Sequence, residues 1–226
     1  VMKHNRHPLR SLCAVLLTAA MLLGITACGE SSFDASGYVS AALKAVTTGD
    51  TADLEGYSKE AVTDIADDYS DGVQEMLEEL AEDEEIPEDV KTEYKGLIES
   101  MMGAISYTVG EAAEATEGSA SGYTVPVTVK PLELNIKDQL TEWAQGLEED
   151  EYDIEDLDAF YQKLYGEIAA MLKDAIAAKE YGEEKTINLT VSKNEDGLYD
   201  VEEDGLTELA ENLFSTDIED MYSDLE

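Results

Sequence analysis

Carboxylates are the most abundant side chains in the sequence that could carry out chemistry. The 226 residues include 53 Asp and Glu, and two carboxyl groups at a suitable separation can hydrolyse a glycosidic bond. With so many acids, some pair falls at any chosen separation, so the pattern has almost no specificity for a site. A solvated acidic surface that keeps the protein soluble is the simpler interpretation.

The other common catalytic side chains are scarce. Both histidines, His4 and His7, precede Cys28, and the only other cysteine is Cys13. The chain after Cys28 therefore has no imidazole for Ser-His-acid or Cys-His catalysis or for a usual zinc site. The segment GSASG is no phosphate loop, because no Lys follows it and it opens no helix. We predict no catalytic residue, no metal site and no cofactor.

One acidic segment, SKNEDGLYDVEE at 192–203, partly fits a calcium-binding loop. The template is matched by Asn194, Asp196, Gly197, Asp200 and Glu203. It fails at the first position, where Ser192 replaces the Asp that such a site most needs. The segment also lies between two predicted strands, where NEDG is a good hairpin turn. The turn is the favoured interpretation, and weak calcium binding is the alternative.

The N-terminal part has the layout of a secretory signal peptide. Lys3, Arg6 and Arg10 precede an apolar run at 12–27 that ends in small residues, as in such signals. A membrane-spanning helix needs about 20 apolar residues, and this run is shorter and has no basic flank after it. We predict a cleaved signal rather than a retained helical anchor.

The end of this run, Ile25-Thr26-Ala27-Cys28, resembles the lipobox of bacterial lipoproteins. The resemblance implies that a diacylglycerol is attached to the Cys28 sulfur through a thioether and that the chain is cleaved before Cys28. A disulfide is not an alternative, because Cys13 lies in the segment that would be removed. We therefore predict lipidation at Cys28 and a position at the cell membrane, facing outside the cytoplasm.

The net charge supports a lipid as the membrane anchor. Three of the 14 basic residues lie in the signal, which leaves 11 against 53 acids, a net charge near −42. Anionic headgroups repel such a chain, whereas two acyl chains at about 0.8 kcal/mol per buried methylene suffice to hold it. Nucleic acid is excluded as a partner, because phosphate binding needs clustered Lys and Arg. We expect a protein, a peptide or another cationic ligand.

The length fits one domain. We predict a signal peptide at 1–27, a tether at 28–33, a single domain at 34–214 and an acidic C-terminal tail at 215–226. Apolar residues at helical spacing predict helices at 34–48, 52–56, 58–80, 87–103, 135–147, 154–179 and 204–214. Asp34 and Asn135 are the predicted N-caps of two of them.

Two pairs of segments change to the alternating pattern of strands. Residues 105–109 and 123–129 form one predicted hairpin, and 187–191 and 199–201 form the other. Pro126 has no N–H to donate, which predicts that its strand lies at an edge or at a bulge and argues against a central position. The order of elements predicts an α+β fold, in which several amphipathic helices cover one face of an antiparallel sheet built from the two hairpins. Whether the two helix-hairpin halves are a duplication stays open.

Four stretches are similar to a family of small uncharacterised lipoproteins of Gram-positive bacteria that carry a domain of unknown function. These stretches are FDASGYVSAALKAVTTGD, ISYTVGEA, GYTVPVTVKPLEL and GLYDVEEDGLTELAENLF. The resemblance implies an envelope location and an α+β fold akin to cystatin-like folds. It assigns no catalytic residue.

Tyrosine is over-represented among the aromatic residues, with 12 Tyr against three Phe and one Trp. Tyr107, Tyr123 and Tyr199 are in phase with the aliphatic residues of the strands, and Tyr161 and Tyr165 are neighbours on a predicted helix. Packing at the core and its rim is the favoured interpretation. The alternative is that several rings line a concave face and hold a peptide or a glycan.

We predict a non-catalytic binding or interaction module at the cell envelope. One alternative is a carboxylate-dependent hydrolase of wall or glycan substrates, and another is a structural or folding-accessory envelope lipoprotein. A deep cleft with two partly buried acids would favour the hydrolase, and an exposed apolar patch would favour the binding module.

Overall fold

The computed structural model describes residues 33–57, 62, 88–115, 122–147, 157–193 and 199–217. The predicted signal, the tether with Cys28 and, apart from Val62, the predicted helix at 58–80 lie outside the described residues.

The described helices follow the predicted order. They are α2 (Ala35–Thr48), the 3-10 helix η1 (Ala52–Gly56), α4 (Glu88–Gly103), α5 (Lys137–Gln145), α6 (Leu157–Ala178) and α7 (Glu203–Glu211). The predicted cap of α2 is confirmed, because an Asp34 carboxylate oxygen accepts a hydrogen bond from the Gly37 N–H at 2.9 Å. Gly49 ends α2 in the left-handed conformation, with φ 71°, which glycine adopts without steric cost.

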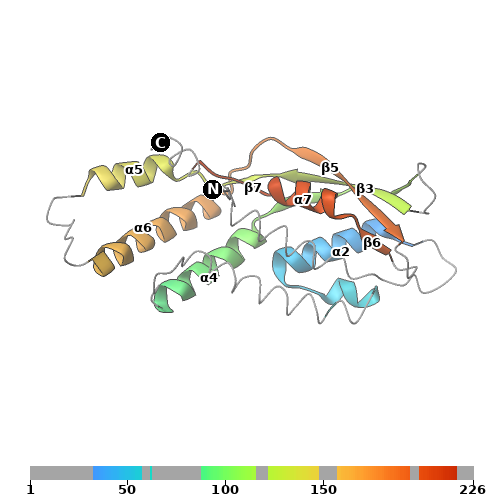
Figure 1. Cartoon of the computed structure of the whole chain (residues 1–226), viewed down its shortest axis with the longest axis horizontal. Helices are drawn as coiled ribbons and strands as arrows, with labels where there is room; N and C mark the ends of the chain where they lie inside the picture. Colours follow the sequence, from blue (N-terminus) through green and yellow to red (C-terminus); the bar gives the residue numbers. More distant parts are fainter. Residues whose placement is uncertain are drawn as a thin grey trace, which may run out of the picture.

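The main sheet is antiparallel and contains both predicted hairpins (Figure 1). Its strands are β1 (Ser106–Val109), β2 (Ala113–Glu114), β3 (Gly122–Lys130), β5 (Lys185–Lys193) and β6 (Tyr199–Val201). The order is β1-β3-β5-β6, and β2 also pairs with β3. The pairing of β3 with β5 joins the two hairpins into one sheet.

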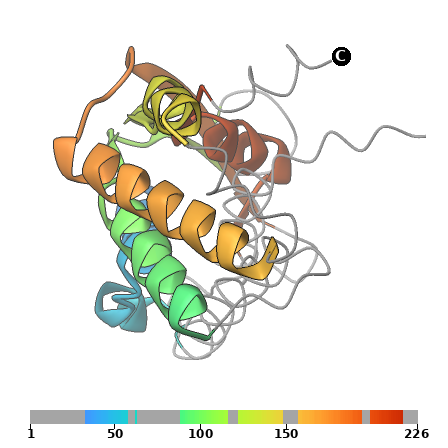
Figure 2. The same ribbon diagram turned by 90° about the vertical axis from the view of Figure 1, so that its left-hand side faces the viewer.

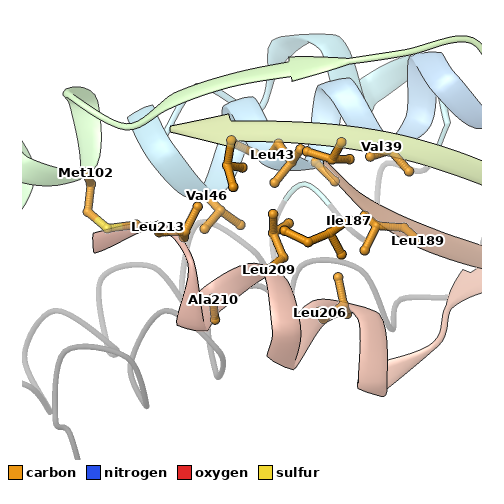
Figure 3. Packing of buried hydrophobic residues seen from close by; sticks show 14 of the residues in the cluster. Val39, Leu43, Val46, Met102, Ile187, Leu189, Leu206, Leu209, Ala210 and Leu213 are labelled. Carbon is orange, nitrogen blue, oxygen red and sulfur yellow. The ribbon is translucent and has the colours of Figure 1, made fainter. Parts of the chain in front are cut away.

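Helices cover one face of this sheet. Val125, Val127 and Val129 of β3 are fully buried on that face, and Ile187 and Leu189 lie beside them on β5. Figure 3 shows side chains of α2 and α7 converging on Ile187 and Leu189. The α+β class, with helices on one face of an antiparallel sheet, is therefore confirmed.

The opposite face of the sheet is polar and rich in threonine. Thr128 of β3 pairs with Thr186 of β5, and their hydroxyl oxygens are 2.8 Å apart. Thr124 and Thr190 form another such pair. This alternation of apolar and hydroxyl side chains fixes which face of each strand is buried.

The prediction for Pro126 is wrong in one part and right in the other. The strand that contains Pro126, β3, is central, with β1 on one side and β5 on the other. The bulge is present, because Val109 faces Val127 whereas Ala113 faces Thr124. The β1–β2 chain therefore takes four steps where β3 takes three, and Pro126 lies at this irregularity.

Ser36 of α2 satisfies the backbone groups at the bulge. The Gly110 N–H donates to the Pro126 carbonyl at 2.8 Å. The backbone nitrogen of Pro126, which has no hydrogen to donate, therefore also faces Gly110. The Gly110 carbonyl instead accepts the Ser36 hydroxyl at 2.9 Å. The same Ser36 oxygen accepts from the Ala112 N–H at 2.7 Å. A helix side chain thus replaces the hydrogen bond that proline cannot make.

Two predictions near the ends of helices are wrong. Asn135 does not cap α5; its side-chain amide donates to Glu133 at 3.4 Å, and a residue far along the chain provides the cap. Helix α7 ends at Glu211, and Phe214 begins β7 (Phe214–Ser215), which pairs in parallel with β4 (Leu132–Glu133). The domain therefore extends into the segment predicted as an acidic tail.

Replacing Ser36 with Ala should destabilise the fold. The change leaves the Gly110 carbonyl and the Ala112 N–H without their partner in a half-buried position, which costs about 1–3 kcal/mol. Urea denaturation of the full chain measures the free energy of unfolding. Ser40→Ala on the exposed side of the same helix is the matched control and should change it by less than about 0.5 kcal/mol. Equal stability of the two variants would contradict the role given to Ser36.

Candidate functional site

The predicted lipidation site, Cys28, lies outside the described residues, and the described chain begins at Phe33. The Phe33 ring stacks on the Tyr199 ring of β6, with centroids 4.0 Å apart and planes 3° apart. The start of the domain is therefore fastened to the end of the sheet where β6 lies.

Phe33 is the centre of an aromatic cluster that consists of Phe33, Tyr38, Tyr57, Tyr123 and Tyr199. The centroids of Tyr38, Tyr57 and Tyr123 lie 5.9 to 6.4 Å from that of Phe33, which is the range for favourable tilted and edge contacts. Burial, and to a lesser extent the nearby Asp200 carboxylate, raises the pKa of Tyr38 above its ordinary value. The cluster is thus the rim of the core rather than a wet pocket.

Packing is confirmed for the tyrosines whose side chains the structure describes. Tyr107, Tyr123 and Tyr199 lie against the core cluster. The Tyr94 hydroxyl of α4 donates to the Tyr165 carbonyl of α6 at 3.1 Å, and the two rings meet edge to face at 6.4 Å. Burial raises the pKa of Tyr94, with Tyr165 the next cause. None of these five tyrosines lines either groove described below.

A second feature is a pair of helical segments that the core does not bury. We use the name helical arm for residues 137–147, which are α5 and the two residues after it, together with residues 157–168 of α6. In Figure 1, α6 runs back alongside α5. Among the described side chains of the arm none is buried, whereas nine of the 14 residues of α2 are.

The arm nevertheless carries large apolar side chains. The half-buried ones are Leu140, Trp143, Leu147, Phe160, Leu164 and Ile168. Leu140 and Trp143 lie on a helix as predicted, whereas Leu147 lies beyond the end of α5 at Gln145. Such a periodic pattern normally indicates a helix face that packs on the core. Here the apolar side chains are only half buried.

An open groove of about 530 Å³ runs between the two helices of the arm. It is lined by Gln139, Glu142, Trp143, Gly146, Leu147, Lys163 and Glu167. Trp143 and Leu147 provide its apolar surface, and the carboxylates of Glu142 and Glu167 stand on opposite helices. Trp143 is the only tryptophan of the chain, and tryptophan is enriched at the centres of protein interfaces.

The position of α5 depends on Asp217, beyond the end of β7. The Asp217 carboxylate accepts from the Ile136 N–H at 2.9 Å and from the Lys137 N–H at 3.1 Å. A carboxylate at a helix N-terminus satisfies free N–H groups and interacts favourably with the helix dipole. Sequence reasoning missed this cap, because the two segments are about 80 residues apart.

Helices α4 and α6 lie side by side (Figure 2), and a second groove, of about 450 Å³, is lined by residues of both. Its walls include Glu93 and Ser100 of α4 and Lys173 of α6. Its lining also includes the buried Leu97 and Ile176. Leu97 and Ile176 belong to the core cluster, whereas Trp143 and Leu147 of the arm do not.

Two described carboxylates come together at Lys44, whose Nζ lies 2.8 Å from an oxygen of Asp50 and 2.8 Å from an oxygen of Asp53. In the described part of the chain, Thr47 is the only buried polar residue, and no three potential metal ligands form a group. Ser192 and Asp200 of the candidate calcium loop are ladder partners on β5 and β6. Asn194, Asp196 and Gly197 lie outside the described residues, so calcium binding stays a hypothesis. Among the helices that the structure describes, none is long and apolar enough to span a membrane.

Comparisons with known proteins find one structural likeness. No family model and no curated protein matches the sequence. A match is found to a candidate lipoprotein, ycdA, from Bacillus subtilis subsp. subtilis strain 168, with 16% identity and a TM-score of 0.48. The match covers 80% of this chain and 56% of that one, so the chain spans about half the length of that protein. A likeness at this level assigns neither a function nor site residues.

Replacing Phe33 with Ala should loosen the aromatic end of the domain. It removes the stack on Tyr199 and the half-buried ring, which costs about 1–3 kcal/mol of unfolding free energy. Urea denaturation and the near-ultraviolet circular dichroism of the tyrosines measure the two effects. Phe33→Leu keeps most of the apolar area and should lose less of the stability but the same part of the aromatic signal. An unchanged stability and spectrum in Phe33→Ala would show that Phe33 is not held by the cluster.

Proposed function

We propose that this protein is a lipid-anchored binding module that works outside the cytoplasm and has no catalytic activity. The observation that carries the proposal is the stacking of the Phe33 ring on the Tyr199 ring. Phe33 lies five residues after the predicted lipidation site, Cys28. Five residues span at most about 18 Å at roughly 3.6 Å each. A lipid on Cys28 would therefore hold the aromatic end of the domain close to the bilayer.

The same tether would direct the helical arm away from the membrane. In Figure 1, β6, which carries Tyr199, and α5, which carries Trp143, lie at opposite ends of the long axis. A module held by one end and exposing apolar side chains at the other is suited to meet a partner at a distance from the bilayer. The acidic chain, which anionic headgroups repel, favours the same orientation.

Binding is favoured over hydrolysis by what the described residues bury and expose. None of the described carboxylates is buried, whereas the arm leaves Trp143 and Leu147 half exposed beside an open groove. A hydrolase of the retaining or inverting type needs two carboxyl groups held across a substrate. An interaction surface needs a partly exposed apolar centre with a polar rim, as the arm has.

Replacing Cys28 with Ser should abolish lipid attachment. Cells grown with an alkyne-tagged fatty acid should label the wild-type chain and leave Cys28→Ser unlabelled, because the thioether needs a sulfur. Cys13→Ser is the matched control and should label normally. Labelling and membrane retention of Cys28→Ser would refute the anchor.

Photo-crosslinking in intact cells tests the binding role of the arm. A photoreactive amino acid at Gln139 or Lys163 should give a discrete crosslinked product, because both residues line the groove. The same amino acid at Glu55, which is exposed on η1, should not give that product. The loss of the product in a Leu147→Asp background would place the contact at the groove. Absence of any product from the arm positions would contradict the binding role.

A further inference from the structure

We infer that the groove of the helical arm receives a basic amphipathic helix of a partner protein. This inference rests on the proposed binding role and adds the chemistry and the shape of the ligand. It is carried by three properties of the arm: unburied apolar side chains, carboxylates on both walls, and two helices with a groove between them.

The apolar side chains need a partner that brings apolar surface of its own. Trp143 lies in the last turn of α5 and Leu147 lies two residues beyond the end of that helix, and both line the groove. Both are half buried. Gly146, at the end of the helix between them, is exposed and carries no side chain to cover the indole ring. An apolar side chain that enters here removes area from water, at about 25 cal/mol per Å².

The charges of the groove select a cationic ligand. Glu142 and Glu167 stand on opposite walls, and Lys163 is the only basic residue among the lining side chains. The whole chain has a net charge of −39. A basic ligand is steered toward such a surface, and charge pairs at the rim fix its register.

The shape of the groove favours a helix over an extended strand. Two helices lying alongside each other leave a groove that a third helix fills, as in helical bundles. Such a ligand places residues i, i+3, i+4 and i+7 into the groove. An extended segment would instead need a free sheet edge for its backbone groups, and the arm has none among its described residues.

The charge also argues against two other occupants. A second copy of this chain docked groove to groove would bring Glu142 and Glu167 against their equivalents, and both copies are strongly acidic, with 53 acids against 14 basic residues each. An anionic lipid surface would be repelled in the same way. The basic amphipathic helix is the occupant for which both the apolar and the charged parts of the groove are complementary.

Trp143 makes the test direct, because it is the only tryptophan in the chain. The full chain in neutral phosphatidylcholine vesicles is titrated with a Leu/Lys peptide of about 18 residues, long enough to form a helix, that lacks Trp and Tyr. We expect a saturable blue shift of the Trp143 emission. A peptide of the same composition with the Leu positions scrambled should bind at least tenfold more weakly.

Charge-reversal variants separate a specific site from general attraction to an acidic chain. Glu142→Lys combined with Glu167→Lys should weaken binding at least tenfold. Glu55→Lys combined with Glu99→Lys changes the net charge equally at exposed positions outside the arm and should weaken it less than threefold. Equal loss in both variants, equal binding of the scrambled peptide, or no shift of the Trp143 emission would overturn the inference.

The outcomes also distinguish this inference from the proposed function. If the peptide fails while photo-crosslinking at Gln139 succeeds, the ligand class is wrong and the binding role stands. If both fail, the binding role itself is refuted. Lipid labelling at Cys28 is independent of either result, because it depends only on the N-terminal segment.

Discussion

Eight residue pairs join β3 to β5 in antiparallel register, from Gly122 opposite Ser192 to Val129 opposite Lys185. Because side chains alternate between the two faces, a slip of one residue would move every buried valine of β3 to the threonine face. The pairing also joins hairpins that lie far apart in the sequence, so α2 and α7 share one core only when this register is formed. The positions of all the other described elements depend on it.

The core that this register creates is complete over the sheet and incomplete at the helical arm. Full burial of a Val or Leu side chain contributes about 1.5–3 kcal/mol, and α2, β3 and β5 have many such side chains. The arm has none among its described residues. The start of α5 is held instead by the carboxylate of Asp217, which is distant in the sequence. Apolar surface that remains unburied in this way is available to a partner.

Local patterns in the sequence predict the helices, both hairpins and the cap of α2 by Asp34, because each depends on residues close together in the chain. Two misplaced features depend on distant residues. Pro126 is tolerated in a central strand because Ser36 satisfies the opposite carbonyl. The cap of α5 comes from Asp217 rather than Asn135. Likewise, the periodicity around Trp143 predicts an apolar face, but only the packing of the whole chain decides whether that face is buried.

The excess of acids has opposite consequences at the two ends of the domain. At the aromatic end, Phe33 and the tyrosines around it provide a neutral, packed support close to the proposed lipid on Cys28. A chain with a net charge of −39 is repelled by anionic headgroups. A lipid anchor at the aromatic end alone would therefore leave the rest of the domain at a distance from the bilayer. At the other end, the same negative charge would disfavour contact between two copies at the arm and, under the proposed binding role, would favour a basic partner. The charge that makes a lipid necessary for membrane attachment would therefore also keep the groove accessible and select what enters it.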